Sequence, residues 1–573
     1  MGSTLSRLRL TLVTFRAISA IYKELNERLK QTPGLPVSNP STPYWAIPAS
    51  PIAQHGSDAT LPSEADILII GSGITGTAVA RTLLAQSDVP QIVMLEARDA
   101  CSGATGRNGG HVTPLLYHDY AALKKKHGAE MAKSILKFRF THIAELIQVS
   151  KDEDILADGQ CRQVETFDVF FDQEMFDLAV QNLNGYLDDM PEQRRLWRVV
   201  GVEECVKDLQ FSKTVVGAIA TTAGAIHPYR FVTSILLRLL GSHPTSFQLF
   251  THTPCLSISS SRSKDGGYTV LTNKGTIQAR HVVHATNGWA SHLLPAMRGK
   301  IVPVRAHMSA QRPGLGLGRT EGAGSQLESS PSASAGGSVL TLTDNPANNW
   351  LGTRSFVMYA DGRYDYLTQQ PSSPPVAEQS LYPPPAAEFM FGGGLAHGEL
   401  AEQAFMDEVG VADDRDCSME TSAYLGGALS LYFGGWGAEG RDTESKSTDK
   451  PIIFGEESEE GRVKKLWTGI LGVSADGRPW VGRLPAKVSG RPAPRGSSSL
   501  KQKHYLNQLA PPGEWISAGY SGEGMVHGLL SGNALAHMIL GNADDVLPDA
   551  FMVTEARWKK AKIEDLVDGF VVS

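Results

Sequence analysis

The stretch that decides the fold runs from residue 65 to residue 97 and reads ADILIIGSGITGTAVARTLLAQSDVPQIVMLEA. Its β-branched run at 67–70 predicts a buried parallel strand. The run ends at glycines in the pattern G-x-G-x-x-G, which are Gly71, Gly73 and Gly76. Residues 75–85 have apolar positions at helical spacing, so a helix N-terminus follows the glycine turn. Its N–H groups can face a pyrophosphate, because glycine has no side chain to obstruct the approach.

A second apolar run, Ile92–Leu95, ends in Glu96. This acid stands about twenty residues after the last glycine, where a carboxylate can accept hydrogen bonds from both ribose hydroxyls of a dinucleotide. Strand, glycines, helix, strand and acid in this order indicate a dinucleotide with an unesterified 2′-hydroxyl. FAD and NAD both remain open at this point.

Length and composition describe a large globular protein. With 573 residues, 41% hydrophobic residues and a net charge of −7, the chain can bury a large core and is expected to divide into at least two domains. Its basic residues are scattered, which argues against a nucleic-acid partner. The five cysteines are Cys101, Cys161, Cys205, Cys255 and Cys417. Their wide spacing without a C-x-x-C pair predicts neither disulfides nor a metal site and favours an intracellular, cytoplasmic location.

Residues 1–60 are expected to form an N-terminal extension that precedes the fold. Three interpretations of its basic, apolar beginning stay open. Gly2 and Ser6 match the N-myristoylation pattern M-G-x-x-x-[ST], the segment is similar to an organelle presequence, and a plain surface helix is the third interpretation. A lipid anchor would give weak membrane association. A transmembrane anchor is not expected, because Arg16 interrupts the apolar run.

Composition changes sharply in four later segments, at 313–337, 371–387, 437–461 and 488–503, which are rich in Gly, Pro, Ser or charged residues. Such segments bury too little apolar surface to offset the entropy of the chain. We therefore predict that they are loop insertions without a chemical role.

The residues after Glu96 depart from the pattern of a nicotinamide dehydrogenase. Residues 97–114 read ARDACSGATGRNGGHVTP, a glycine-rich loop that permits close approach of a large planar group and offers donors to its polar edge. Residues 102–110 resemble the S-G-x-S/T-G-R-N-G-G motif of the D-amino-acid oxidase-like (DAO) family of FAD-dependent oxidoreductases. The R-N-G-G loop is similar to that of the γ-glutamylputrescine oxidoreductase branch, which favours an amine substrate.

Further segments resemble this family in the same chain order. Residues 252–259, HTPCLSIS, resemble the strand that contacts the adenine, and residues 280–295 resemble the segment that returns the chain to the cofactor. Residues 465–485 and 514–541 resemble the two C-terminal flavin segments. The second is expected to contain a strand at 515–518, a glycine turn, and a helix at 526–540 whose N-terminus favours negative charge on a reduced flavin.

The resemblance implies an α/β fold, α+β overall, in which a Rossmann-like FAD-binding domain carries a discontinuous substrate domain built on an antiparallel sheet. The FAD-binding domain is expected at 61–159, 226–299 and 462–573. The substrate domain is expected at 160–225 and 300–461 and includes the low-complexity insertions.

FAD is the cofactor that the resemblance implies. The flavin-linked cysteine of the sarcosine oxidase branch would fall near Leu471 or Gly472, and residues 467–484 contain no cysteine, so we expect non-covalent FAD. The expected FAD-binding residues are Gly71, Gly73, Ile74, Thr75, Gly76, Glu96, Ala97, Arg98, Ser102, Gly103, Thr105, Arg107, Asn108, Gly109, Gly110, Cys255, Thr286, Gly522, Gly524 and Met525.

In flavin amine oxidation the cofactor performs the hard step and the protein mostly positions the substrate. Polar side chains beside the flavin motifs are the candidates for the substrate face: His111, His227, Tyr229, Tyr366, Tyr520, Glu523 and His527. We expect His111, Tyr520 and His227 to act in catalysis, with His111 and Tyr520 foremost because both adjoin motifs that should lie against the flavin ring. The alternative for each is a structural residue with satisfied hydrogen bonds.

Two lysines of the sarcosine oxidase branch are missing. Val526 replaces the lysine that holds the substrate carboxylate, and residues 388–395 contain no lysine to activate oxygen. Because an unpaired buried carboxylate is costly, α-carboxylated substrates are expected to be poor unless Arg305 or Arg354 supplies the cation, whereas Glu523 can attract a cationic amine.

The expected function is therefore oxidation of the C–N bond of a small amine or amino-acid-like substrate to an imine, with oxygen as acceptor. One alternative keeps the fold and acts as a dehydrogenase on a larger metabolite. The other is a flavin-binding subunit without turnover.

Overall fold

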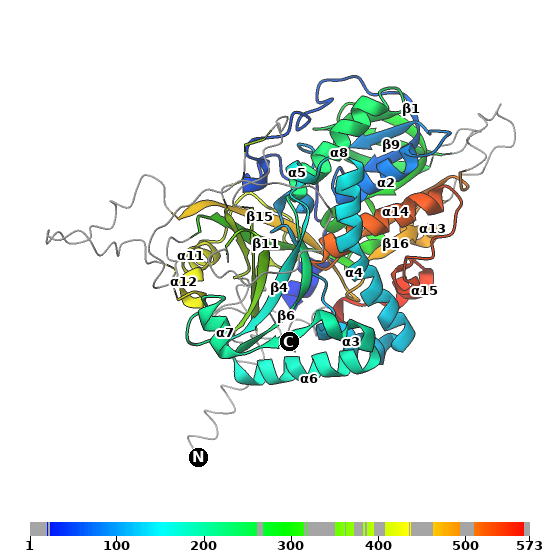
Figure 1. Ribbon diagram of the computed structural model, residues 1–573. Coiled ribbons are helices and arrows are strands. Elements are labelled where there is room, and N and C mark those ends of the chain that lie inside the picture. Colours follow the sequence, from blue (N-terminus) through cyan, green and yellow to red (C-terminus); the bar gives the residue numbers. More distant parts are fainter. Residues whose placement is uncertain are drawn as a thin grey trace, which may run out of the picture.

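The computed structural model describes residues 20, 23–260, 267–313, 317, 350–360, 363–371, 382–383, 385, 387–394, 407–434, 436, 462–492 and 509–565. Two sheets organise this part of the chain, with the long helix α4 (Ala129–Asp152) running between the regions that they define (Figure 1). In these residues no helix combines the length and the apolar character that crossing a membrane requires.

The first sheet has the strand order β16-β17-β10-β1-β2-β7. Its strands are β16 (Trp480–Arg483), β17 (Gly513–Ala518), β10 (Gly275–His284), β1 (Glu64–Ile70), β2 (Ile92–Leu95) and β7 (Phe247–Phe250), with β8 (Cys255–Ser260) and β9 (Tyr268–Thr272) attached through β10. All neighbours from β17 to β7 pair in parallel. Residues 67–70 of β1 and the whole of β2 are apolar and buried, as is typical of parallel strands that are covered on both faces.

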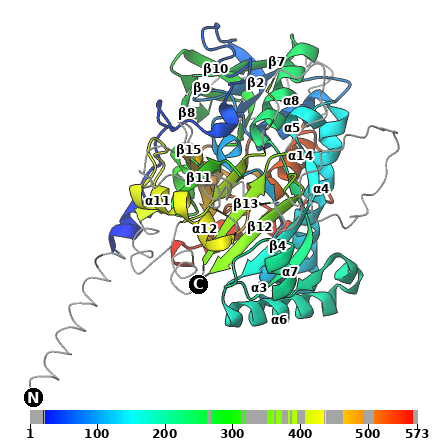
Figure 2. The same cartoon turned by 60° about the vertical axis from the view of Figure 1, so that its left-hand side comes forward.

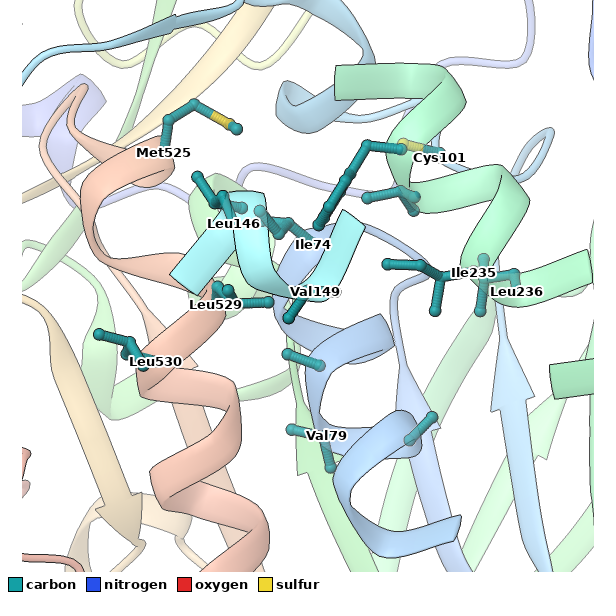
Figure 3. Packing of buried hydrophobic residues seen from close by; sticks show 14 of the residues in the cluster. Ile74, Val79, Cys101, Leu146, Val149, Ile235, Leu236, Met525, Leu529 and Leu530 are labelled. Atoms are coloured by element: carbon teal, nitrogen blue, oxygen red, sulfur yellow. The ribbon is translucent and has the colours of Figure 1, made fainter. Parts of the chain in front are cut away.

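Four helices pack together beside this sheet: α2 (Ile74–Leu84), α4, α8 (Pro228–Ser242) and α14 (Gly528–Ile539). Figure 3 shows Ile74 and Val79 of α2 between apolar side chains of the other three. Helices α2 and α14 approach closely at Gly532, where a Cβ atom would lie 2.7 Å from the Cβ of Ala78. This packing holds the N-terminus of α2 in place at the edge of the sheet.

The second sheet has the order β15-β11-β14-β13-β12-β4-β6-β3, with β5 paired to β6. Its strands are β15 (Val463–Ser474), β11 (Ile301–Gln311), β14 (Phe389–Gly392), β13 (Arg363–Gln369), β12 (Arg354–Ala360), β4 (Arg162–Phe170), β6 (Gly217–Ala225), β3 (His111–Val112) and β5 (Arg198–Val200). Neighbours are antiparallel except β12 and β4, which are parallel. An aromatic-rich core includes residues of these strands, of α11 (Met419–Gly427) and of α12 (Leu429–Tyr432). Figure 2 shows both helices beside the second sheet.

The remaining helices connect or cover these layers. They are α3 (Tyr117–His127), α5 (Leu156–Gly159), α6 (Gln173–Asp189), α7 (Val202–Lys207), α9 (Ala290–Leu293), α13 (Ala486–Ser489) and α15 (Glu555–Lys560). Short 3-10 turns are η1 (Tyr44–Ala46), η2 (Ala104–Arg107), η3 (Pro191–Leu196), η4 (Asn287–Trp289), η5 (Pro295–Met297), η9 (Gly524–Val526) and η10 (Asp549–Phe551).

The expected mixed α/β architecture is confirmed, and the strands and helix expected at 65–97 are β1, α2 and β2. The helix expected at 526–540 begins later, at Gly528, because η9 precedes it. Strand β15 lies in the second sheet, although 462–573 was expected in the FAD-binding domain. The domain limits stay a prediction.

Two expectations about peripheral segments need correction. Residues 23–60 are not separate from the fold, because Trp45 and Ile52 belong to its largest apolar core. The insertion predicted at 488–503 begins inside α13, where Val488 is buried, and Arg491 forms an ion pair of 2.6 Å with the buried Glu514. Most of the other three predicted insertions lies outside the described residues.

Candidate functional site

A cavity opens at the carboxyl ends of β1, β2 and β10, beside the N-terminus of α2. Open α/β sheets bind their ligands at this edge. About 1230 Å³ of the cavity is free of protein atoms, including its opening to solvent, so an extended ligand has room there.

Most of the residues expected to bind FAD line this cavity. They are Gly71, Gly73, Ile74, Thr75, Glu96, Ala97, Arg98, Gly103, Thr105, Asn108, Cys255, Thr286, Gly522, Gly524 and Met525. Residues separated by more than 400 positions therefore meet at one site. Cys255 and Glu96 lie in its wall together with Leu293 and His292, whereas Gly522 and Met525 come from the C-terminal turn.

Backbone geometry explains the first two glycines of the motif. Gly71 has φ of +109°, and a Cβ atom there would lie 2.6 Å from the carbonyl oxygen of Ala285. At Gly73 a Cβ atom would meet the hydroxyl of Thr105 at 3.0 Å and protrude beside the helix N-terminus. That hydroxyl accepts a hydrogen bond from the backbone N–H of Ile74.

Glu96 lies in the cavity wall with both carboxylate oxygens engaged. One oxygen accepts from the N–H of Ser72 at 3.1 Å and from its hydroxyl at 2.7 Å, and the other accepts from the N–H of Arg98 at 3.1 Å. A carboxylate has further lone pairs for ribose hydroxyls, so these bonds orient the side chain and leave acceptor capacity.

Five expected FAD-binding residues do not line the cavity: Gly76, Ser102, Arg107, Gly109 and Gly110. At three of them the backbone lies too close to a neighbour for a side chain. A Cβ atom at Gly76 would lie 2.0 Å from the carbonyl oxygen of Gly71, and one at Gly110 would lie 2.2 Å from the carbonyl oxygen of Ile226. A Cβ atom at Gly109 would lie 2.5 Å from the ring of Tyr366. The absence of a side chain permits these close contacts, and their contact with FAD stays a prediction.

Arg107 belongs to a buried polar knot behind the loop. Its guanidinium donates to the carbonyl oxygens of Ser102 and Thr468, both at 2.7 Å, and lies 3.5 Å from the carboxylate of Asp414. Arg98 pairs with the same carboxylate at 2.8 Å. Burial lowers the pKa of Arg107 to about 10, so it stays charged near neutral pH and holds the loop shape.

The cavity fits FAD on two further observations. The hydroxyl of Thr286 and the indole N–H of Trp289 are buried in its lining without a hydrogen-bond partner, although such groups are usually satisfied. A ligand with many polar atoms would satisfy them. The N-cap of helix α2 is also a glycine, Gly73, which has no side chain to cap the helix. The N–H of Ile74 donates to Thr105, and the N-terminal turn beyond it has no capping side chain at Gly73 that would exclude a phosphate.

His111 follows the R-N-G-G loop directly and begins β3, the edge strand of the second sheet, which packs against η9. Its Nε2 lies within hydrogen-bond distance of the hydroxyls of Ser355, at 3.1 Å, and Thr113, and its ring stacks on Tyr366 with centroids 6.0 Å apart. Burial lowers the pKa of His111 to about 3, so the imidazole is neutral at physiological pH.

Tyr520 lines the cavity through its ring, while its hydroxyl lies 2.8 Å from the hydroxyls of both Thr75 and Ser517. Burial raises its pKa to about 12, so the phenol remains protonated. The hydroxyl thus ties the start of α2 to the C-terminal turn.

His227 does not line the cavity. Its Nδ1 accepts from the N–H of Arg230 as the N-cap of α8, its ring packs on Trp45 with centroids 4.4 Å apart, and burial lowers its pKa well below the usual value. These contacts are those of a structural residue and give its expected catalytic role no support. Tyr229 is likewise buried, and its hydroxyl accepts from the N–H of Ser50.

The turn before α14 holds a buried ionic cluster. Glu523 lies between the cavity-lining Gly522 and Gly524, and its Oε2 pairs with Arg139 of α4 at 2.9 Å. Arg139 also pairs with Asp119 at 2.7 Å, and its Nε lies 3.4 Å from the ring of His527. The other carboxylate oxygen of Glu523 is buried without a partner. Burial, opposed by Arg139, raises the pKa of Glu523 to about 7.

Sequence reasoning missed several contributors. Trp289 and Asn287 line the cavity directly after Thr286, and their place at the end of a predicted strand could have indicated them. The sequence signal for Arg139 is its position between two phenylalanines, in the run FRF at 138–140. Gly34, Leu35 and Pro36 also line the cavity, and no local pattern pointed to them.

Comparison with known proteins agrees with this site. Residues 66–538 match the model of the family DAO, described as FAD dependent oxidoreductase. No curated protein matches the sequence significantly.

Solved structures show a similar fold. Glycine oxidase from Geobacillus kaustophilus superposes with a TM-score of 0.55 at 14% identity, covering 86% of this chain and 99% of its own. L-amino acid deaminase from Proteus myxofaciens, in complex with anthranilate, superposes with a TM-score of 0.55 at 13% identity. The match covers 92% of this chain and 100% of the deaminase. L-proline dehydrogenase from P. horikoshii superposes with a TM-score of 0.53 at 15% identity. The match covers 86% of this chain and 97% of the dehydrogenase.

Proposed function

Because the chain belongs to the DAO family of FAD-dependent oxidoreductases, we propose that it oxidises the C–N single bond of an amine to an imine. The substrate carbon loses a hydrogen with two electrons, and its nitrogen loses a proton. When bound, FAD supplies the two-electron acceptor for this step, and dioxygen, reduced to hydrogen peroxide, is the proposed final acceptor. The solved relatives named above act on amino acids according to their titles, which supports C–N chemistry.

The cavity residues would hold FAD without a covalent bond. Glu96 would accept from the ribose, and the N-terminus of α2 would face the pyrophosphate. Leu471 occupies the cavity wall where a covalently linked relative would carry its cysteine, which supports a non-covalent complex.

The observation that carries the substrate proposal is the unpartnered carboxylate oxygen of Glu523. His111 does not line the cavity, but β3 packs against η9 beside Glu523. His111 is neutral and Tyr520 is protonated near neutral pH, so neither adds charge beside this turn. Glu523 and Asp119 place two carboxylates around the one guanidinium of Arg139. An ammonium group can supply the cation that this arrangement lacks.

A carboxylated substrate has no matching partner in the arginines that sequence analysis suggested. Arg305 donates to both carboxylate oxygens of Glu408, and Arg354 lies 3.8 Å from a carboxylate oxygen of Glu165. Val526 is buried in the apolar core. Amines without an α-carboxylate are therefore the proposed substrates.

Anaerobic stopped-flow reduction with matched pairs tests the proposal. Ethylamine is compared with D-alanine, and dimethylamine with sarcosine, by loss of flavin absorbance. The amine of each pair should reduce the flavin faster, and admission of air should restore the absorbance. Faster reduction by the carboxylated member would contradict the substrate class. No reduction by any of a broad amine panel would favour a larger metabolite or a flavin-binding subunit without turnover.

A matched pair of variants tests whether Glu523 causes the faster reduction of the flavin by the amine. Glu523→Gln should abolish the advantage of the amine. Glu153→Gln is the control, because the side chain of Glu153 has the same 15% exposure and pairs with two arginines, Arg81 and Arg238, but it lies at the C-terminal end of α4 and not in the turn between the cavity-lining Gly522 and Gly524.

The five cysteines are all unpaired, which supports a proposed intracellular, cytoplasmic location.

A further inference from the structure

Residues 32–53, here called the N-terminal strap, precede the family match, which begins at residue 66. The strap nevertheless contributes Gly34, Leu35 and Pro36 to the lining of the cofactor cavity. Leu35 is 38% exposed, although it faces the cavity. A ring system bound there would cover this apolar side chain.

The first anchor of the strap lies beside the wall that contains Cys255. The hydroxyl of Thr32 lies 3.2 Å from Nδ1 of the cavity residue His292. Arg98, another lining residue, donates to the carbonyl oxygen of Val37 at 3.5 Å. Contacts on both sides of residues 34–36, with His292 and with Arg98, thus hold this segment in the cavity lining.

The second anchor is Ser41, which is built into the polar knot of Arg98, Arg107 and Asp414. Its N–H and its hydroxyl both donate to the carbonyl oxygen of Asp414 at 2.8 Å, and its hydroxyl oxygen accepts from the N–H of Thr468 at 3.0 Å. The knot that shapes the R-N-G-G loop therefore also fixes the strap.

The third anchor is Trp45, which is 2% exposed in the main core. Its indole N–H donates to the carbonyl oxygen of Asn108, which lines the cavity in the R-N-G-G loop. The strap thus connects the wall around His292 with the loop around Asn108.

We propose that the N-terminal strap, which lies outside the family match, is a cofactor-retaining element that covers FAD at residues 34–36 and must open before FAD dissociates. The proposal concerns FAD retention and stands whatever substrate the enzyme oxidises. Between the first two anchors, Ser38 and Asn39 are exposed, so this short stretch is the place to open the strap without disturbing a buried contact.

The test is to cut the strap in the folded holoenzyme. A site for a specific protease is inserted between Ser38 and Asn39, and FAD release after dilution is followed by the rise in free-flavin fluorescence before and after cleavage. Cleavage should accelerate FAD release at least tenfold. The same protease site between the exposed Asp545 and Val546, which do not line the cavity, is the control and should leave the rate unchanged.

A release rate that changes less than twofold on cleavage would overturn the proposal. If the insertion prevents folding, Leu35→Ser in the uncut chain gives a second test. This variant should release FAD several-fold faster with an unchanged Tm of the apoprotein, and an unchanged release rate would equally overturn the proposal.

Discussion

Replacing Glu523 by glutamine should make the protein more stable at alkaline pH, although it should impair amine oxidation. The side chain of Glu523 is 15% exposed, and burial raises the pKa of its carboxyl from 4.5 to about 7 despite the ion pair with Arg139. A pKa raised on folding means that this group favours the folded state fully below about pH 4.5, and that this contribution is lost as pH rises through 7. The shift corresponds to about 3 kcal/mol at roughly 1.4 kcal/mol per pH unit.

Glutamine resembles the protonated carboxyl, so Glu523→Gln should match wild type in Tm near pH 5 and exceed it above pH 8. With an unfolding entropy of about 2 cal/mol/K per residue, 3 kcal/mol corresponds to a gain of about 3 °C for a chain of this size. Differential scanning calorimetry of both FAD-saturated proteins at one scan rate, from pH 5 to pH 8.5, measures this difference.

A Tm difference that does not change with pH, or a variant that is less stable than wild type at pH 8.5, would refute the claim that ionisation of Glu523 destabilises the folded protein. Glu153→Gln should not gain Tm at any pH, because it only loses ion pairs with Arg81 and Arg238. A carboxylate kept in a destabilising position is typical of a functional site.

Three further outcomes are expected. Acid precipitation should leave the yellow cofactor in the supernatant, whereas a yellow pellet would show a covalent link. Glu96→Ala should weaken FAD binding measured by fluorescence titration, since two charge-assisted hydrogen bonds of about 1.5–3 kcal/mol each are lost, and unchanged affinity would argue against the ribose contact. Deletion of residues 318–336, which lie outside the described residues, should leave flavin content and Tm nearly unchanged. Loss of soluble protein would show that this segment is structural.

The sequence by itself determined the cofactor half of the site. The glycines of the turn, the strand and helix around them, and Glu96 at the end of β2 all follow from short-range rules of periodicity, backbone freedom and spacing. Such rules work where a function needs consecutive residues, because a phosphate contacts the backbone of one turn. These rules indicated a dinucleotide site, and the resemblance of further motifs to the DAO family implied most of the residues that line the cavity.

Only the tertiary structure decided which distant side chains meet. Glu523 and Arg139 are 384 positions apart, and nothing local to either residue selects the other. His227 was expected to act in catalysis, but in the structure its ring packs against Trp45 and its side chain caps the N-terminus of α8. The N-terminal strap reads as an extension in sequence, but hydrogen bonds to Asp414 and Asn108 bring it over the cavity. Burial, pairing and pKa depend on these long-range contacts, and they arise only when the whole chain has packed.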